Sequence, residues 1–538
     1  MPKKKSVAFT LDFNPAFKRA FSLMEDTTKH VFVTGRAGTG KSTLLSYFRD
    51  HTKKNIVVLA PTGVAAVNVR GQTIHSFFGF KPHVTLAKVR RMKEVEGEEN
   101  IYQALDAIVI DEVSMVRADL LDCIDKFLRL NGRDDRLPFG GVQMIMIGDL
   151  YQLPPVVTRD EQEIFSRHYA TPYFFSAHVF SPQKKLLHDD NDFLLELVEL
   201  ETIYRQRDPA FIALLNSIRN NTVGEVELST LNSRYSPLHE RQADDTAIYL
   251  MTTNAMANEM NTIELQKLPE ELRSFTGERS GDFEDTYLPT DPDLAIKIGA
   301  QVMLLNNDPD ARWINGTIGQ VISFEPSYEA HSELINVELT TGDIVAVAPH
   351  RWDIYRFHYD EKIKRIDAES VGSFTQYPLR LAWAVTIHKS QGKTFDRVIV
   401  DIGRGTFSPG QLYVALSRCT TFEGIILKRQ IRKEHIWTDE RVVAFMTGVQ
   451  YVQAEATMSL KEKVALIEGV IDSGEKLAIT YLKAEDSKSK RVIIPHEVGE
   501  MEYQGQTYVG VSAYCLEMKA NRIFRVDRIL SMEVIASE

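Results

Sequence analysis

Cysteine is scarce in this chain. Only three of its 538 residues are cysteines, Cys123, Cys419 and Cys515, and they lie far apart without the spacing of a zinc site. A disulfide framework and a zinc centre are therefore excluded, and the composition is typical of a reducing compartment. No apolar run reaches the length that spans a bilayer, and we see no signal-peptide core, so we expect no membrane segment.

Positive charge is also in short supply. The chain has 63 Lys and Arg against 74 Asp and Glu, which gives a formal net charge of −11. This charge argues against a protein that coats polyanions over its whole surface, although a local basic channel for nucleic acid remains compatible with it. The length exceeds what one hydrophobic core supports, so we predict three or more domains.

One stretch has the spacing of a phosphate-binding loop. It consists of Gly35, Arg36, Ala37, Gly38, Thr39, Gly40, Lys41, Ser42 and Thr43, between an apolar run at 31–34 and helical spacing over 44–48. Glycines allow several backbone N–H groups to point at one anion where a helix begins. We predict that Lys41 reaches the β- and γ-phosphates and that the Ser42 hydroxyl ligates Mg²⁺. An ordinary glycine-rich turn would not need the flanking strand and helix.

Apolar runs predict parallel strands at 31–34, 56–60, 107–110 and 143–148, with helical segments such as 119–129 between them. This alternation predicts a doubly wound α/β domain whose ligands bind beyond the carboxyl ends of the strands. A second set of runs, at 247–251, 379–384, 397–401 and 424–427, predicts a second parallel sheet.

Polar side chains follow two of the predicted strands. Asp111 and Glu112 end the run at 107–110, and Gln152 lies in the turn after 143–148. We predict that Asp111 holds Mg²⁺, that Glu112 orients and deprotonates the attacking water, and that the Gln152 amide senses the γ-phosphate. Taken alone, each motif also fits a strand or turn that leaves the core into solvent.

The segments 60–66 and 73–78 place hydroxyl and small residues beside aromatics, a combination that suits phosphate contact and base stacking. The candidate DNA contacts in them are Thr62, Gly63, Val64, His75 and Phe77. A core-packed loop is an equally good interpretation of these residues.

In this order the motifs resemble those of the petite-integration-frequency (PIF) family of superfamily 1B DNA helicases, which are related to RecD. Three later stretches complete the resemblance, at 200–206 with Arg205, at 381–392 and at 413–418 with Arg418, so that it covers about residues 10–435. The resemblance implies that Arg205, Gly392 and Arg418 join the nucleotide site. It also implies DNA contacts by Asn254, Asn307, Thr386, His388 and Lys389, with ATP and Mg²⁺ as cofactors.

The chain departs from the family at one position. Many members carry an Asn-x-x-Gln stretch near the start whose glutamine reads adenine, whereas here Asn14 is followed by Phe17 at that place. The motifs therefore predict hydrolysis of a nucleoside triphosphate more strongly than they predict that ATP is preferred over the other nucleoside triphosphates.

The resemblance implies an α/β fold with two RecA-like parallel-sheet domains. We expect the first at 1–188, with a small 1B wedge at about 61–82, and the second at 189–305 and 379–436. Alternating strands at 301–305, 319–324, 334–339 and 344–347, with a hairpin turn at 340–343, resemble an SH3-like 2B insertion, which we place at 306–378. A helix and linker follow at 437–459, with a flexible joint at 453–459.

The segment 460–538 resembles a WYL domain, a small β-barrel. Its strands are predicted at 477–482, 490–495, 506–511, 512–516 and 524–529. Arginine beside tyrosine suits phosphate and base contact, so Arg491, Tyr508, Arg522 and Arg525 form a candidate ligand face. A solvated, salt-bridged face is the competing interpretation.

The resemblance implies an ATP-dependent DNA helicase that moves 5′→3′ on single-stranded DNA, in a bacterial cytoplasm. Single-stranded DNA and single-strand/duplex junctions are the expected partners of a monomeric motor, with forks, D-loops, G-quadruplexes and RNA–DNA hybrids left open as substrates. The family works in DNA repair, recombination and telomere maintenance. A translocase that does not separate strands and a nucleotide-gated regulator remain alternatives, whereas a small-molecule kinase would not need two RecA-like halves.

Overall fold

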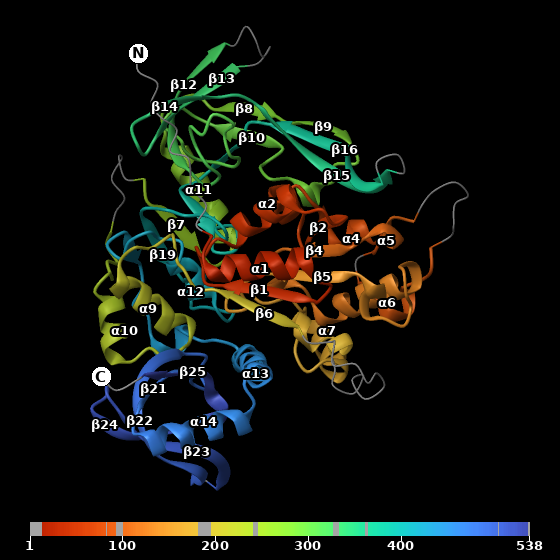
Figure 1. Cartoon of the computed structure of the whole chain (residues 1–538). Helices are drawn as coiled ribbons and strands as arrows, with labels where there is room; N and C mark the ends of the chain where they lie inside the picture. Colours follow the sequence, from red (N-terminus) through yellow and green to blue (C-terminus); the bar gives the residue numbers. More distant parts are fainter. Residues whose placement is uncertain are drawn as a thin grey trace, which may run out of the picture. The chain divides into compact units, whose positions relative to one another are not determined.

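The computed structural model describes residues 13–81, 83–92, 100–180, 195–239, 246–326, 333–360, 364–503 and 505–535 (Figure 1). Two compact units make up the chain. One contains the residues up to Ile212 together with Leu231–Ile431, and the other contains Ala213–Thr230 together with Arg432–Glu538. Among the described residues, no helix combines the length and the apolar character needed to cross a membrane.

The first unit begins with a six-stranded parallel sheet in the order β3-β2-β4-β5-β1-β6. Its strands are β1 (Val31–Gly35), β2 (Ile56–Ala60), β3 (Gln72–Thr73), β4 (Ala107–Ile110), β5 (Gln143–Ile147) and β6 (Glu196–Leu200). The helices of this part are α1 (Pro15–Asp26), α2 (Lys41–His51), α3 (Gly63–Asn68), α4 (Ile74–Phe77), α5 (Ile101–Ala104), α6 (Ala118–Asn131) and α7 (Arg159–His168). The four strands and the helix expected here are confirmed.

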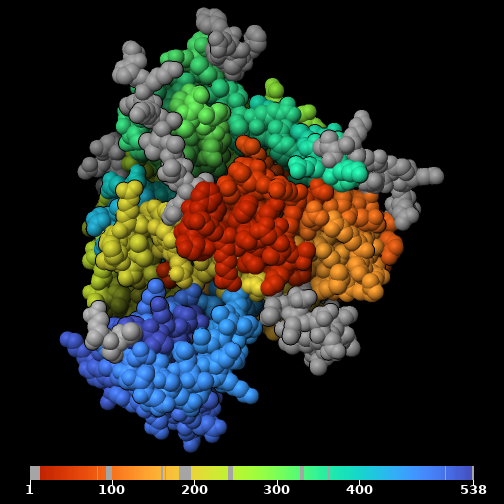
Figure 2. Space-filling model, viewed as in Figure 1, coloured from red at the N-terminus to blue at the C-terminus, as the bar shows by residue number. Residues whose placement is uncertain are grey.

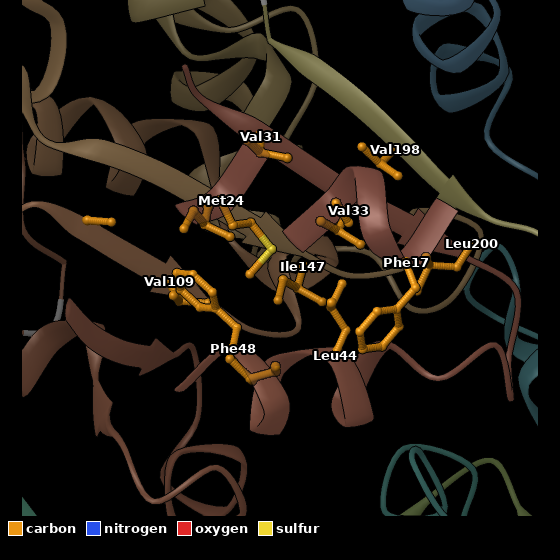
Figure 3. Close-up of a cluster of buried hydrophobic side chains, with 14 of the residues drawn as sticks. Phe17, Met24, Val31, Val33, Leu44, Phe48, Val109, Ile147, Val198 and Leu200 are labelled. Atoms are coloured by element: carbon orange, nitrogen blue, oxygen red, sulfur yellow. The ribbon is translucent and has the colours of Figure 1, made fainter. Parts of the chain in front are cut away.

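Apolar residues on both faces of the strands explain why this sheet is covered by helices. Phe17 and Met24 of α1 and Leu44 and Phe48 of α2 pack against a shared layer of strand valines and isoleucines (Figure 3). Helix α1 is started by Asn14, whose side chain accepts a hydrogen bond from the Phe17 N–H. This layer fixes β1 and α2, and with them the loop between the two.

Two predicted boundaries differ from the structure. The first domain does not end at 188, because β6 (Glu196–Leu200) pairs with β1 along its whole length. The segment predicted as a separate wedge contains β3, which pairs with β2 and therefore extends the first sheet. Both differences arise because strand pairing depends on tertiary neighbours that a local apolar pattern does not reveal.

A second parallel sheet has the order β18-β7-β19-β20. It contains β7 (Ile248–Met251), β18 (Ala384–Thr386), β19 (Val398–Asp401) and β20 (Ile425–Leu427), with helices α11 (Asn254–Lys267) and α12 (Gln411–Leu416). The strand expected at 379–384 is wrong. Its first half is β17 (Leu379–Leu381), which pairs antiparallel with β11 in another sheet, and only its end enters β18.

The insertion is larger than the predicted 306–378, because its three antiparallel sheets also take in strands that begin at Arg273 and end at Leu381. The largest has the order β14-β13-β12-β11-β17 and includes β11 (Gln301–Leu304), β12 (Ile318–Pro326), β13 (Glu333–Leu339) and β14 (Ile344–Val347). These strands and the turn between β13 and β14 agree with the prediction. The other two sheets were not predicted, and they consist of β8 (Arg273–Thr276) with β10 (Asp293–Ile296), and β9 (Glu278–Gly281) with β15 (His350–Asp360) and β16 (Arg365–Gln376).

The insertion lies against the first sheet domain. Figure 2 shows its green residues beside the red and orange residues of that domain. Three contacts support this arrangement: a Cβ on Gly63 would clash with the backbone of Thr286, the rings of Phe77 and Phe357 are 6.2 Å apart, and the Ile366 N–H donates to Asn55.

The second unit contains α13 (Glu440–Thr457), α14 (Leu460–Ser473) and a five-stranded antiparallel sheet in the order β24-β23-β22-β21-β25. The strands are β21 (Lys476–Leu482), β22 (Lys488–Tyr503), β23 (Gln506–Cys515), β24 (Ala520–Arg525) and β25 (Ile529–Ile535). Within the described residues the sheet is open, with β24 and β25 at its edges, so the predicted barrel closure is absent there. The strands predicted at 506–511 and 512–516 are one strand, and the segment 524–529 is not a strand of its own.

The predicted joint at 453–459 is also wrong. Helix α13 continues to Thr457, and α14 begins at Leu460 behind a capping box made by Ser459 and Glu462. The unit also includes Ala213–Thr230, which takes up the second half of α9 (Pro209–Arg219) and most of α10 (Glu225–Asn232). No pattern in the sequence indicates that this earlier segment belongs with the end of the chain.

Candidate nucleotide site and nucleic-acid surface

The loop between β1 and α2 has the backbone of an anion-binding site. Gly40, at the N-cap of α2, has φ of +88°, and Gly38 has φ of +80°, both in the left-handed region that favours glycine. A Cβ on Gly38 would also lie 2.5 Å from the Cβ of Arg205. These glycines therefore allow the loop to curl while a motif arginine packs against it.

The polar groups of this loop are held by protein atoms that phosphate oxygens can replace. Lys41 Nζ donates to the carbonyl oxygens of Gly35 at 2.7 Å and Arg36 at 3.0 Å. The Ala37 N–H donates to the hydroxyl of Tyr413 at 3.1 Å. Desolvation lowers the pKa of Lys41, and the carboxylates of Asp149, Glu112 and Asp111 oppose that change. A cation in such a place is stabilised by a bound anion.

Asp111 and Glu112 follow β4 at the carboxyl edge of the sheet, as predicted. Desolvation raises the pKa of Glu112 to about 7, and repulsion from Asp111 adds to the rise. The pKa of Asp111 is also raised by desolvation, while a backbone hydrogen bond and Lys41 act in the opposite direction. Glu112 has φ of +50°, a left-handed conformation that is rare for a residue with a side chain. A carboxylate with a pKa near neutrality is suited to take a proton from water.

A chain of amides links the two parallel-sheet halves. Gln152 is 7% exposed and its Nε2 donates to Asp149 at 3.1 Å. Its Oε1 accepts from Gln391 Nε2 of the other half at 3.3 Å. The predicted sensor therefore contacts both halves, through a glutamine that the sequence analysis did not single out. Gly392 follows Gln391 in the chain, with φ of +76° and open space where a Cβ would stand.

Arg205 and Arg418 lie together beside the loop. Arg418 is 2% exposed and donates from Nε to the Val414 carbonyl at 2.9 Å and from Nη2 to the Ser417 hydroxyl at 3.0 Å. Desolvation lowers its pKa to about 9, with repulsion from Arg205 as the next cause. Glu112 and Asp149 oppose this shift, so the arginine lies within electrostatic range of the acids.

The site has few ligands for a metal of its own. Within the part of the chain that the structure describes, no group of three or more His, Cys, Asp or Glu side chains is placed to hold a metal ion. Mg²⁺ usually binds through one or two protein oxygens together with substrate phosphates. The Ser42 hydroxyl in the first turn of α2 and the Asp111 carboxylate fit that role, because the desolvated acid pair gains from a nearby cation.

The predicted DNA contacts divide into exposed and buried residues. Val64, Asn254, Asn307 and Lys389 are exposed, as is Thr62, and His75 and His388 are partly exposed. Gly63 lies beneath the backbone of Thr286 and Tyr287. Phe77 is 7% exposed within an aromatic cluster that includes Phe78, Tyr102 and Phe357, and Thr386 is 3% exposed. Gly63, Phe77 and Thr386 are packed against other residues in this structure, so DNA contact by these three stays a prediction.

Phe407 is an aromatic side chain that the sequence analysis missed. It is 59% exposed and its ring is nearly parallel to that of His388, with 6.4 Å between centroids. An exposed aromatic pair of this kind can stack on bases. Only the exposure of Phe407 marks it, and the sequence does not show exposure.

The four residues of the candidate face in the second unit do not share one surface. Arg525 lies over the ring of Tyr508 at 5.1 Å and pairs with Asp527 at 2.7 Å. Arg491 and Arg522 stand opposite Ile479 and Ala513, which belong to the core. Opposed residues of an antiparallel pair share a face, so these two arginines lie on the other side of the sheet from Tyr508.

The chain is similar to known helicases over most of its length. The PIF1-like helicase model matches residues 12–227, the UvrD-like helicase C-terminal domain matches 381–421 and the WYL domain matches 462–534. The ATP-dependent DNA helicase Pif1 of Bdellovibrio bacteriovorus is 31% identical over 428 residues, which cover 78% of this chain and 88% of that protein. The chain belongs to the PIF1-like helicase family.

Fungal members of the family are matched over less of their own length. The ATP-dependent DNA helicase PIF1 of Emericella nidulans is 30% identical over 87% of this chain and 67% of its own length. The ATP-dependent DNA helicase RRM3 of Saccharomyces cerevisiae is 29% identical over 80% of this chain and 66% of its own length. This PIF1-like helicase therefore spans about two thirds of these two relatives.

Solved structures of the family share the fold. Bacteroides sp Pif1 in complex with ADP-AlF4 is 37% identical over 81% of this chain and 97% of that one, with a TM-score of 0.72. Bacteroides Pif1 bound to ssDNA covers the same shares at 36% identity, with a TM-score of 0.57. This PIF1-like helicase is thus more similar in arrangement to the former than to the latter.

Proposed function

We propose that the protein is an ATP-dependent DNA helicase that moves 5′→3′ on single-stranded DNA and unwinds duplex DNA. The observation that carries the proposal is the meeting of both halves at one phosphate loop: Tyr413 contacts Ala37, Gln391 contacts Gln152, and Arg205 reaches the residue before Arg418. A motor needs such a site because hydrolysis there changes the distance between the halves.

The same geometry supports the roles that we propose for individual residues. Bound nucleotide would replace the carbonyls that now hold Lys41, while Ser42 and Asp111 would hold Mg²⁺, which supplies charge neutralisation between phosphate oxygens. Glu112 would accept a proton from the attacking water. Arg205 and Arg418 would stabilise the charge that develops on the γ-phosphate. Gln152, which contacts both halves, would form a hydrogen bond to the γ-phosphate when it is bound.

Single-stranded DNA would run over the exposed residues at the carboxyl edges of both sheets. Val64 and His75 on the first half and Asn254, His388 and Lys389 on the second are available for this contact. The backbone of Thr286 and Tyr287, which lies over Gly63, would have to move for DNA to reach that loop. The lower TM-score against the DNA-bound relative is consistent with such a movement. Arg525 stacked on Tyr508 offers a further site for phosphate and base.

The test measures ATP hydrolysis with and without single-stranded DNA, and displacement of a labelled strand from duplexes with a 5′ or a 3′ tail. We expect DNA to stimulate hydrolysis and only the 5′-tailed duplex to be unwound with ATP and Mg²⁺. Lys41→Ala should abolish both activities while single-stranded DNA binding persists, because Lys41 contacts phosphate and not DNA. Hydrolysis without strand displacement would favour the non-unwinding translocase, and no DNA stimulation would favour the regulator.

A further inference from the structure

Gln206 follows the first motif arginine and has no role in the account above. Its side chain is buried, at 3% exposure. The Nε2 atom lies 3.1 Å from the carbonyl oxygen of Ser417 and 2.8 Å from that of Cys419. These two carbonyls stand on either side of Arg418, so both N–H groups of one amide hold the backbone that carries the arginine.

The same short backbone segment is held by two further donors. Arg205 Nη1 donates to the Ser417 carbonyl at 3.1 Å, and the Phe395 N–H donates to the Arg418 carbonyl at 2.9 Å. Three successive carbonyls are therefore each bound by a donor from elsewhere in the fold. The amide of Gln206 supplies two of the four hydrogen bonds, and it is the contact that fixes both ends of the segment.

Gln206 lies in the segment between β6 of the first sheet and α9, whereas Ser417 and Cys419 follow α12 beside the second sheet. The residue before Gln206, Arg205, packs against Gly38 of the phosphate loop, so this segment connects that loop with 417–419. A buried carbonyl without a hydrogen-bond donor destabilises the fold, so the segment 417–419 has one favourable position relative to Gln206. Because Arg418 lies within that segment, the position of its guanidinium is set as well.

We propose that Gln206 is a positioning residue for Arg418: its amide sets the main chain at 417–419 so that the guanidinium meets the γ-phosphate when the halves close. The inference rests on the proposed role of Arg418 in ATP hydrolysis. It assigns to Gln206 no contact with nucleotide, which separates it from Gln152.

The test replaces Gln206 by methionine, which keeps the length of the side chain and removes both donors. We expect kcat for DNA-stimulated hydrolysis to fall about 10- to 100-fold, because small misplacements of a charge-stabilising group have effects of that order. Affinity for ADP–aluminium fluoride should fall by a similar factor, while ADP affinity stays within about twofold, since the arginine acts on the transition state. In an Arg418→Ala background, Gln206→Met should add no further loss of kcat.

Gln450→Met is the matched control. Gln450 is another buried glutamine whose Nε2 donates to two oxygens, those of Met446 and Asp486, in the second unit. Its substitution should leave kcat unchanged, and a melting curve on each variant shows whether the fold is kept. If Gln206→Met is insoluble, Gln206→Glu takes its place. Its kcat relative to the original protein should rise as pH falls, because the protonated acid regains a donor, and a flat ratio overturns the proposal.

The outcomes separate the two proposals. A normal kcat for Gln206→Met beside a low kcat for Arg418→Ala overturns the positioning role and keeps the role of Arg418. A normal kcat for Arg418→Ala overturns both. Equal losses of ADP affinity and kcat, or an undiminished effect of Gln206→Met in the Arg418→Ala background, would also overturn the positioning role, since the glutamine would then act independently of the arginine.

Discussion

Arg418 is a buried cation that donates to the carbonyls of Val414 and Lys393 and to the hydroxyl of Ser417. These neutral groups are weak partners compared with a phosphate, so nucleotide should draw the guanidinium away from them. Arg418→Ala should lower kcat about 10³- to 10⁵-fold, the range found when comparable arginines are removed from phosphoryl-transfer enzymes. Affinity for ADP should change little, because ADP lacks the γ-phosphate.

The measurement is steady-state hydrolysis at saturating DNA, together with nucleotide titration. Arg418→Lys is a useful companion, since lysine keeps the charge but not the planar fork and should restore only part of kcat. A loss of ADP affinity as large as the loss of kcat would show that Arg418 contributes to ground-state binding or to the fold.

Most of the site could be predicted from the sequence, because its motifs are local. A phosphate loop, an acidic pair after a strand and a sensor glutamine each lie within a few residues. Gln206, Tyr413 and Gln391 were not predicted, because their importance comes from partners in another part of the chain. The burial of Phe77 was not predicted for the same reason, since it depends on partners such as Phe357 of the insertion.

At the level of elements, His30 ties the start of β1 to its neighbour β5. The Met144 N–H donates to His30 Nδ1 at 3.0 Å, and burial lowers the pKa of His30 to about 4. The unfolded chain binds a proton on this residue below its ordinary value of 6.5, whereas the folded chain does not until about pH 4. Stability should therefore fall by up to about 3 kcal/mol between those two pH values and be fully present above them.

Thermal or urea unfolding between pH 7 and 4.5, measured on the original protein and on a His30→Gln variant, checks this expectation. Glutamine can still accept from the Met144 N–H but does not titrate, so the variant should lose less stability on acidification. Equal losses in the two proteins would show that other groups dominate the acid sensitivity of this sheet.

The elements themselves were predicted unevenly. The buried parallel strands β1, β2, β4 and β5 were found because continuous apolar runs identify strands covered on both faces. The hairpin of β15 and β16 was missed because charged residues such as Arg351, Arg356 and Glu369 occupy much of its length. The split of β17 from β18 was missed because an apolar run does not say which sheet it will join.

At the scale of the whole molecule, the second unit is built from two segments that lie far apart in the sequence. Residues of α13 contact the hairpin between β21 and β22: Gln450 donates to Asp486 at 2.8 Å, and Tyr451 donates to the Leu482 carbonyl at 3.1 Å. Arg219 of the earlier segment is 2% exposed, and its Nη1 lies 3.9 Å from Asp486. Asn220 Nδ2 donates to the Asp486 carbonyl at 3.2 Å.

A chain ending at Val452 should therefore not behave as an intact motor without its tail. It keeps the segment 213–230 and α13 only as far as Val452, and it lacks the sheet against which they pack, so buried groups such as Arg219 lose their partners. We expect this shortened chain to be less soluble than the full chain and to be cleaved faster by proteases near 213–230. Arg219→Met in the full chain should produce the same two effects to a smaller extent. Full solubility and normal DNA-stimulated hydrolysis of the shortened chain would contradict this integration.

The pairing of Arg219 with Asp486 also concerns the time at which the protein is made. A ribosome that adds about 5–20 residues per second needs on the order of 13 to 50 seconds to travel from one to the other. During that interval the remaining part of the first unit, Leu231–Ile431, is made, while 213–230 has none of its final neighbours from the sheet of the second unit. An arginine that is almost fully enclosed in the finished protein thus remains without its final partner until Asp486 has been made, and this stretch is where a nascent chain would be open to chaperones, to proteases and to wrong partners.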